Sequence, residues 1–115
     1  MFYQGNLTII LLFGLGDFVA LNYFLVSYDV SDPKRLREVN RLLKGFGNGI
    51  HYSVFRCDLT RKGKVELIAC IAEVIDHSED RVMIVDLGPV EGSVKERVTF
   101  LGKRPPRRER RAVIV

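Results

Sequence analysis

The chain has 115 residues, of which 47% are hydrophobic and 28% charged, and its formal net charge is +4. This length allows one domain with a single core, and the composition is ordinary for a globular domain. The positive charge makes an anionic partner plausible, nucleic acid first. Cys57 and Cys70 have no CxxC neighbour and no ligand spacing with His51 or His77, which disfavours a structural zinc site. We expect both cysteines to be small core residues in a reducing compartment.

Residues 1–22 are unusual because Leu7 to Leu15 is almost wholly apolar. With the apolar residues that follow, this segment reaches membrane length, but Asp17 and Asn22 interrupt it, and a mid-span charge costs about 2.5–3.5 kcal/mol. The first six residues contain no Lys or Arg, which disfavours a secretory signal. Three interpretations remain open: an upstream extension outside the domain, an accessory segment packing on it, or a membrane anchor. We expect the first, in a cytoplasmic protein without stable membrane association.

The segment Tyr23–Val30 predicts a buried strand, because aromatic and β-branched residues dominate it and no Gly or Pro interrupts it. Asp32 and Pro33 then predict the N-cap and the first residue of a helix. Asp29 ends the strand, where its carboxylate would be held on rigid backbone. It is either a polar strand terminator or an oxygen ligand for a hard divalent cation.

Helical spacing after Pro33 predicts the buried face of the first helix, formed by Leu36, Val39, Leu43 and Phe46. Gly45 and Gly47 predict its end, because glycine readily takes the left-handed conformation there. Basic residues occupy the other sides of this helix: Lys34, Arg35, Arg37, Arg41 and Lys44. They form a solvated face that could also guide a phosphate backbone.

The next region, 50–59, is β-prone throughout and must supply two strands, although it contains no Gly or Pro turn signal. Alternation puts Ile50, Tyr52 and Val54 on one side, and His51, Ser53 and Phe55 on the other. Thr60 predicts the cap of a second helix. The apolar stripe of that helix is expected at Val65, Ile68, Ile71, Ala72 and Ile75.

The rest of the chain predicts two more strands and a tail. Arg81–Leu87 reads as a strand buried on most of both faces, and Arg97–Leu101 as a short one. Residues 103–111 form a basic, proline-containing linker before Ala112–Val115, an apolar tail that would pair with a sheet edge. This order predicts an α+β, ferredoxin-like βαββαβ sandwich with an extra C-terminal strand.

Several segments, in order, resemble the CRISPR-associated Cas-two family over residues 23–115. They are Tyr28–Asp32 with Lys34 and Arg35, Tyr52–Phe55 with Cys57, Glu79–Ile84, Val94–Val98, Leu101–Lys103 and Ala112–Val115. The chain departs from the family at Gly49, where members commonly have Arg, and at His51, where they have Gln. The loss of that Arg would remove a phosphate contact.

The resemblance implies a homodimeric subunit of CRISPR adaptation, part of antiviral defence, that bridges copies of the Cas-one integrase and holds duplex DNA, with RNA as a second candidate ligand. It also implies an enzyme, a metal-dependent endonuclease that hydrolyses RNA or DNA. Asp29 matches the catalytic, metal-binding acid of the family. Two copies of Asp29 would face each other across the dimer axis and hold one Mg²⁺ or another divalent cation.

Further residues are candidates, some by the same resemblance and others by the chemistry of their side chains. The residues expected to line the site are Tyr28, Ser53, Phe55 and His51. Those expected to bind nucleic acid are Lys34, Arg35, Arg37, Lys103, Arg104, Arg107 and Arg108. The expected division of the chain is 1–22 as an extension, 23–102 as the domain, and 103–115 as a linker and a strand that pairs with the partner protomer.

Other functions are weighed against this one. A stand-alone, toxin-type ribonuclease of the same fold is the main alternative, and neighbouring genes would separate the two. An RNA-recognition module shares the βαββαβ order, but its third-strand signature of Lys or Arg, Gly and an aromatic does not occur here. A small-molecule regulatory domain would rarely need a Pro-Pro-Arg-Arg linker.

Overall fold

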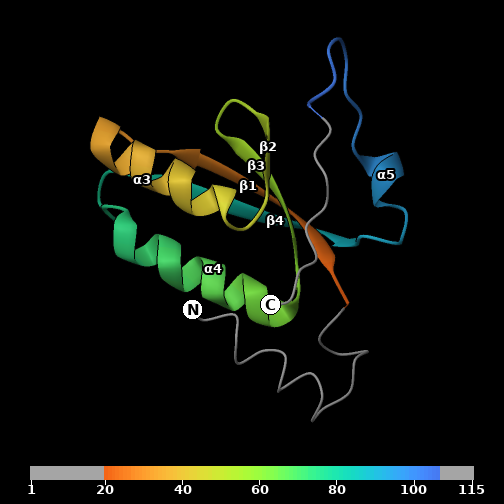
Figure 1. Cartoon of the computed structure of the whole chain (residues 1–115), viewed down its shortest axis with the longest axis horizontal. Helices are drawn as coiled ribbons and strands as arrows, with labels where there is room; N and C mark the ends of the chain where they lie inside the picture. Colours follow the sequence, from red (N-terminus) through yellow and green to blue (C-terminus); the bar gives the residue numbers. More distant parts are fainter. Residues whose placement is uncertain (1–19, 107–115) are drawn as a thin grey trace.

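The structure, a computed structural model, describes residues 20–106, without the side chain of Lys95. Its elements are β1 (Asn22–Asp29), α3 (Pro33–Lys44), β2 (Asn48–His51), β3 (Val54–Leu59), α4 (Arg61–Val74), β4 (Arg81–Pro89) and α5 (Val94–Arg97). The strands form one antiparallel sheet in the order β2-β3-β1-β4, with α3 and α4 on one face (Figure 1). The predicted ferredoxin-like βαββαβ arrangement is confirmed. The linker from residue 107 and the tail Ala112–Val115 lie outside the described residues.

The core lies between the sheet and the two helices, with β1 at its centre. Alternate residues of β1 and β3 face the helices and are buried: Phe24, Val26, Tyr28, Phe55, Cys57 and Leu59. The helices contribute Val39, Leu43, Leu67 and Ile71. Burial raises the pKa of the Cys57 thiol to about 12, helped by the neighbouring Asp58 carboxylate. Cys57 is therefore an unreactive core residue, as expected, whereas Cys70 is only half-buried.

Helix α3 begins as its sequence predicts. The Asp32 carboxylate accepts a hydrogen bond of 2.9 Å from the backbone N–H of Arg35, and Pro33 occupies the first turn. The expected left-handed glycine at its end is wrong, because Gly45 has φ −78° and Gly47 also lacks a positive φ. Gly47 is needed for a close approach instead. A Cβ there would overlap the Arg56 carbonyl oxygen and lie 2.7 Å from the Sγ of Cys57.

The two strands predicted in region 50–59 form a hairpin whose turn is Tyr52–Ser53. Ser53 has φ +62°, the left-handed conformation that glycine or asparagine usually supplies in tight turns. The simple alternation expected through Ile50, Tyr52 and Val54 is wrong, because the turn intervenes and leaves Tyr52 88% exposed. The turn lacked a signal because its left-handed residue is a serine.

Helix α4 is capped as predicted, since Thr60 Oγ1 accepts a 3.0 Å hydrogen bond from the Gly63 N–H. Its buried face is different from the predicted one and consists of Gly63, Leu67 and Ile71. Of the predicted stripe, Ile71 is buried and Ile75 packs partly against the core. The other three members of that stripe are exposed: Val65, Ile68 and Ala72.

Strand β4 is an edge strand of the sheet, so none of its residues is fully buried, contrary to the expectation of burial on both faces. It continues through Gly88, which has φ +94°, to Pro89. The strand expected at Arg97–Leu101 is also wrong: α5 ends at Arg97 and the next residues are irregular. Among the described helices, none is long and apolar enough to cross a membrane.

Candidate metal and nucleic-acid site

Asp29 lies at the carboxyl end of β1, where it is exposed and paired in register with Arg81. The N–H of the preceding Tyr28 donates a 3.1 Å hydrogen bond to the Ser53 carbonyl, which ties this strand end to the β2–β3 turn. The start of α3 lies at the same end of the molecule (Figure 1). Because successive strand residues point to opposite faces, Asp29 lies on the face away from the helices.

The predicted site-lining residues divide between the two faces. Tyr28 and Phe55 are buried under the helices, with ring centroids 6.2 Å apart, and the Tyr28 hydroxyl accepts a 3.1 Å hydrogen bond from Asn40 Nδ2. Neither ring therefore lies on the sheet face of Asp29. Ser53 is half-buried in the turn, and His51 is exposed at the end of β2. These two remain at the Asp29 end of the sheet.

The donor set at this end is small. Between residues 20 and 106 there is no cluster of three His, Cys, Asp or Glu side chains that could hold a metal ion. The carboxylate of Asp32 already caps α3, which leaves Asp29 as the strand-end carboxylate. One described protomer therefore does not provide a metal site. A divalent cation at Asp29 would need further oxygen donors from a second copy or from a bound phosphate.

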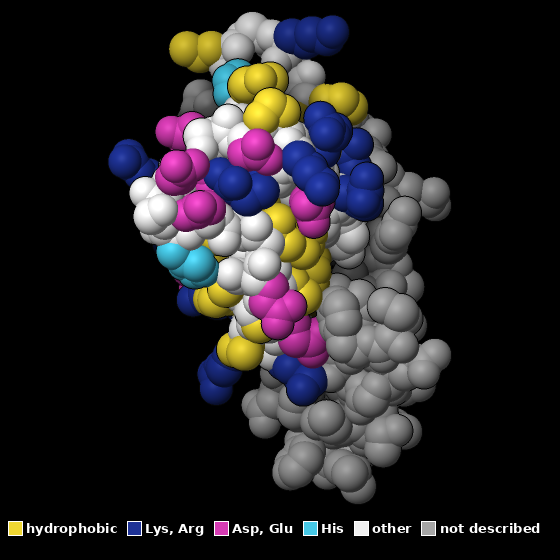
Figure 2. All heavy atoms as spheres, turned by 90° about the vertical axis from the view of Figure 1, so that its left-hand side faces the viewer, with side chains coloured by type: hydrophobic (Ala, Val, Ile, Leu, Met, Phe, Trp, Pro, Cys, Tyr) yellow, Lys and Arg dark blue, Asp and Glu magenta, His cyan; other side chains and the backbone are white. Residues whose placement is uncertain are grey.

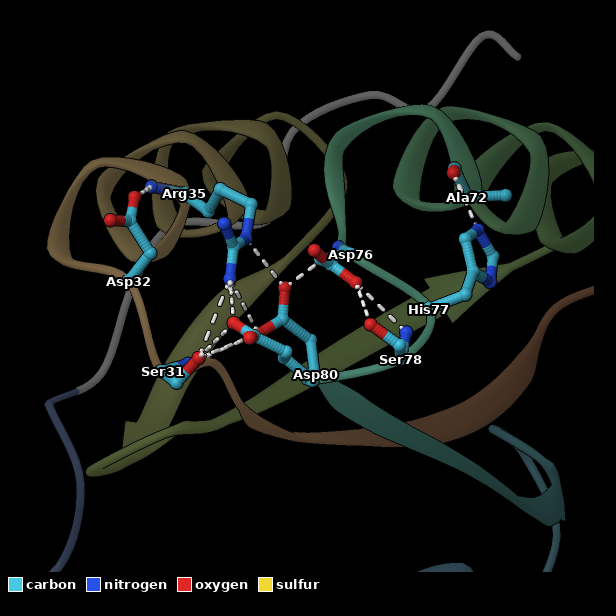
Figure 3. Close-up of polar contacts among 9 residues, drawn as sticks. Ser31, Asp32, Arg35, Ala72, Asp76, His77, Ser78 and Asp80 are labelled. Carbon is cyan, nitrogen blue, oxygen red and sulfur yellow. Dashed lines mark hydrogen bonds and ion pairs between the residues drawn. The ribbon is translucent and has the colours of Figure 1, made fainter.

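A partly buried ion pair joins the start of α3 to the segment between α4 and β4 (Figure 3). Arg35 Nε donates to Asp80 Oδ2 at 2.8 Å, and Arg35 Nη2 donates to Asp80 Oδ1 at 3.2 Å. The backbone N–H groups of Ser31 and Asp76 also donate to this carboxylate, at 3.1 and 2.8 Å. We call these four residues the Arg35–Asp80 clasp. The hydrogen bonds from Arg35, then those from the two backbone groups, hold the pKa of Asp80 well below its usual range.

The clasp involves Arg35, one of the residues expected to bind nucleic acid. Its Nε and Nη2 groups already donate to Asp80, and Nη2 also reaches Ser31 Oγ and Glu79 Oε1 at 3.4 and 3.5 Å. The sequence analysis did not predict the clasp. The pairing joins side chains 45 positions apart, and its only local signal is the pair of acids before β4.

The remaining basic candidates lie in two separate places. Lys34 and Arg37 are exposed on α3, together with Arg41 and Lys44. Figure 2 shows Lys and Arg side chains gathered along one flank of this end, next to acidic ones. Lys103 and Arg104 are exposed in the segment after α5, which Figure 1 shows apart from α3. Arg107 and Arg108 lie outside the described residues. Within residues 20–106, one protomer thus does not bring the basic candidates of α3 together with Lys103 and Arg104.

Comparison with known proteins agrees with this fold. The family described as "CRISPR associated protein Cas2" matches residues 22–91. A protein named CRISPR-associated endoribonuclease Cas2 from Geobacter sulfurreducens is 41% identical over 92 residues, covering 80% of this chain and 96% of its own. A Rhodospirillum rubrum protein with the name CRISPR-associated endoribonuclease Cas2 1 is 38% identical over 96 residues, covering 84% and 93%.

Solved structures show the same similarity. The crystal structure of Streptococcus pyogenes Cas2 matches with a TM-score of 0.59 and 31% identity, over 70% of this chain and 99% of that one. A hypothetical protein from Thermus thermophilus gives a TM-score of 0.63 at 29% identity, over 75% and 96%.

The fold, with Asp29 at the end of β1, thus places this chain in the same class of small ferredoxin-like proteins as these relatives. The chain belongs to the CRISPR-associated Cas2 family, as its sequence motifs led us to expect.

Proposed function

We propose that this protein is a dimeric subunit of CRISPR adaptation that binds duplex DNA together with the Cas1 integrase, and that it can cleave phosphodiester bonds with a divalent cation at Asp29. The observation that carries the proposal is the exposed Asp29 at the carboxyl end of the central strand, within the Cas2 match. The relatives named endoribonuclease support RNA as one substrate.

The open face of the sheet supports a homodimer. In-register pairs put Leu25 beside Val85, and Ser27 beside Met83 and Val54, on the face away from the helices. Met83 is 57% exposed there. The face also carries the Arg56–Asp58 ion pair, with Arg56 in register with Leu25. A partly apolar sheet face that α3 and α4 do not cover is suited to pairing with a second copy. Asp29 belongs to this same face.

Two Asp29 carboxylates brought together by such pairing would supply oxygen ligands of the kind that Mg²⁺ prefers. The bound cation would offset charge on a phosphate and favour an attacking hydroxide. What the chain itself provides is a rigid strand end, fixed by the hydrogen bond from Tyr28 to Ser53. His51 and Ser53 are the neighbouring polar side chains available to orient a substrate.

Nucleic acid would be held mainly through its phosphates. Lys34 and Arg37 on α3, with Lys103, Arg104, Arg107 and Arg108 of the linker, are the expected contacts. Such binding weakens as salt rises, because each neutralised phosphate releases counterions. Gly49 contributes no side chain where family members commonly carry Arg, so affinity depends more on the other basic residues.

A stand-alone, toxin-type ribonuclease is the second candidate. The relatives' name, endoribonuclease, favours it, since that name refers to RNA cleavage. Both functions would use the same fold and the same aspartate.

Asp29→Ala is the variant that tests the proposed activity. We expect metal-dependent cleavage of RNA or duplex DNA by the unmodified protein, and a loss of about a hundredfold or more in the variant, because a metal ligand is removed. Cleavage is measured on both substrates with Mg²⁺ and with a chelator. Glu38→Ala, which removes an exposed carboxylate from α3, is the matched control and should keep full activity.

Both proteins must first be shown to have equal stability and the same oligomeric state. Cleavage that survives in Asp29→Ala would overturn the role of this residue. If neither protein cleaves yet both bind duplex DNA, the nuclease part of the proposal fails and the scaffold part stands.

A further inference from the structure

Helix α4 is apolar on two opposite sides. One side, Gly63, Leu67 and Ile71, is buried against the core. The other side, which we call the outer stripe, consists of Val65, Ile68, Ala69 and Ala72. At 100° per residue these four positions span an arc of about 100°, centred opposite the buried side. Burial against a single core accounts for one apolar side of a helix, and the outer stripe is a second one.

The outer stripe is not covered by the described residues. Val65 is 62% exposed and Ile68 45% exposed, and both alanines are exposed as well. Large exposed side chains that follow one another at helical spacing are uncommon on a solvated face, where the same positions usually carry charge. The spacing 65, 68, 69 and 72 matches that of a helix face packed against a partner.

The chain itself contains a segment with complementary chemistry. Residues 7–15, Leu-Thr-Ile-Ile-Leu-Leu-Phe-Gly-Leu, carry no charge and lie outside the region matched to the family. The described chain reaches Leu21 beside the end of β4, where the Leu21 carbonyl accepts a 2.9 Å hydrogen bond from the Val90 N–H. Asn22 pairs in register with Leu59, and Thr60 caps α4. The N-terminal segment therefore enters the fold at the end of the sheet where α4 begins.

The distances allow this segment to reach the outer stripe. Six residues, 16–21, separate Leu15 from β1 and can span about 20 Å when extended. Along α4, Val65 lies about 8 Å and Ala72 about 18 Å from the Thr60 cap, at 1.5 Å per residue. The whole stripe is thus within reach of residues 7–15 of the same chain.

We propose that residues 7–15 dock on the outer stripe of α4 and cover it within the same protomer. The contact would bury the apolar residues of both partners and explain why α4 is apolar on two sides. A second copy of the chain and a lipid surface are the competing occupants of the stripe, and each gives a different experimental result.

Hydrogen exchange of the full chain, followed by mass spectrometry, tests the proposal. In the unmodified protein we expect amides 7–15 to exchange at least about tenfold more slowly than in an unstructured peptide. The double variant Val65→Lys, Ile68→Lys should lose that protection, because it places two charges on the docking surface. Ala72→Glu, a milder change on the same stripe, should lose part of it. Leu101→Lys, at a 90% exposed leucine outside α4, is the matched control and should lose none.

The exchange rates of amides 7–15 are compared between variants whose β1 amides exchange equally slowly, since slow β1 exchange shows that the domain remains folded. Unprotected amides 7–15 in the unmodified chain would overturn the proposal, as would protection that the stripe variants leave unchanged. Protection that increases over a tenfold rise in protein concentration would assign the stripe to a second copy. Binding to neutral phosphatidylcholine vesicles by the unmodified protein but not by the double variant would assign it to a membrane. Either assignment would overturn docking within the protomer.

Discussion

At the residue scale, the Asp80 side chain is held in place by several hydrogen-bond donors. Its carboxyl group is fully enclosed and accepts hydrogen bonds from Arg35, Ser31 and Asp76. These donors stabilise the ionised carboxylate, because protonation removes its negative charge and places a hydrogen on an oxygen that now accepts them. The clasp therefore links protein stability to the ionisation of one acid.

We expect Asp80→Asn to be less stable than the unmodified protein at pH 7, and to lose part of the dependence of stability on acid. The pKa of Asp80 is lowered by folding. Its contribution is therefore complete above the unfolded value of about 4 and is lost as pH falls toward the folded value. The difference in unfolding free energy between the two proteins should shrink from pH 7 to pH 3. Urea unfolding at several pH values measures it.

Glu79→Gln is the control for that experiment. Glu79 is 62% exposed at the side chain and contacts Arg35 at 3.5 Å, so it should change stability little. Parallel pH profiles for Asp80→Asn and the unmodified protein would contradict the role of the clasp.

At the scale of elements, local signals predicted β1, α3 and the start of α4 well. Their caps and spacing lie within a few residues, so the sequence alone specifies them. The hairpin turn had no such signal, because Ser53 takes its left-handed conformation under tertiary constraint. For α4, the sequence has two apolar sides, and residue spacing alone does not show which of them packs against the core. The alternation of β1 puts Asp29 and Tyr28 on opposite faces of the sheet, so period-2 reasoning could have placed the Tyr28 side chain in the core.

The α3–β2 connection depends on the close approach of Gly47 to β3. We expect Gly47→Ala to destabilise the protein by about 1–3 kcal/mol, because the new methyl group would overlap the Arg56 carbonyl and the Cys57 sulfur. Gly49→Ala, two residues along, is the matched control, since a Cβ there would lie 3.6 Å from the Phe55 ring, an ordinary contact. Chemical denaturation compares the two variants. Equal free energies of unfolding for the two variants would show that the segment around Gly47 can move away from β3 at little cost.

At the scale of the whole molecule, the sheet has one face under helices and one open, and the Asp29 end belongs to the open face. The family and its fold were predictable from ordered motifs, although each motif alone is weak. The arrangement of two protomers was predicted from resemblance only, since one chain shows the exposed face and not what covers it.

We expect the protein to be a dimer that Met83→Glu weakens by tenfold or more, because a two-fold contact would bring the new charges together in an apolar interface. Sedimentation velocity over a range of concentrations measures the dissociation constant. Val65→Glu adds the same charge on α4, which packs on the opposite face of the sheet and where we propose a contact within the protomer, and it should not affect association. If Val65→Glu dissociates the dimer and Met83→Glu does not, the protomers pair through α4 instead.

The separation in sequence between the two halves of the clasp also has a consequence for folding kinetics. Arg35 and Asp80 are 45 positions apart, with β2, β3 and α4 between them in the sequence, so their contact closes a long loop. Closing such a loop costs chain entropy, and we therefore expect this contact to form after the folding transition state. Loss of the clasp should then accelerate unfolding while leaving the refolding rate nearly unchanged, a division that the two limbs of a chevron plot resolve. The lifetime of the native state, rather than the speed of reaching it, would depend on this ion pair.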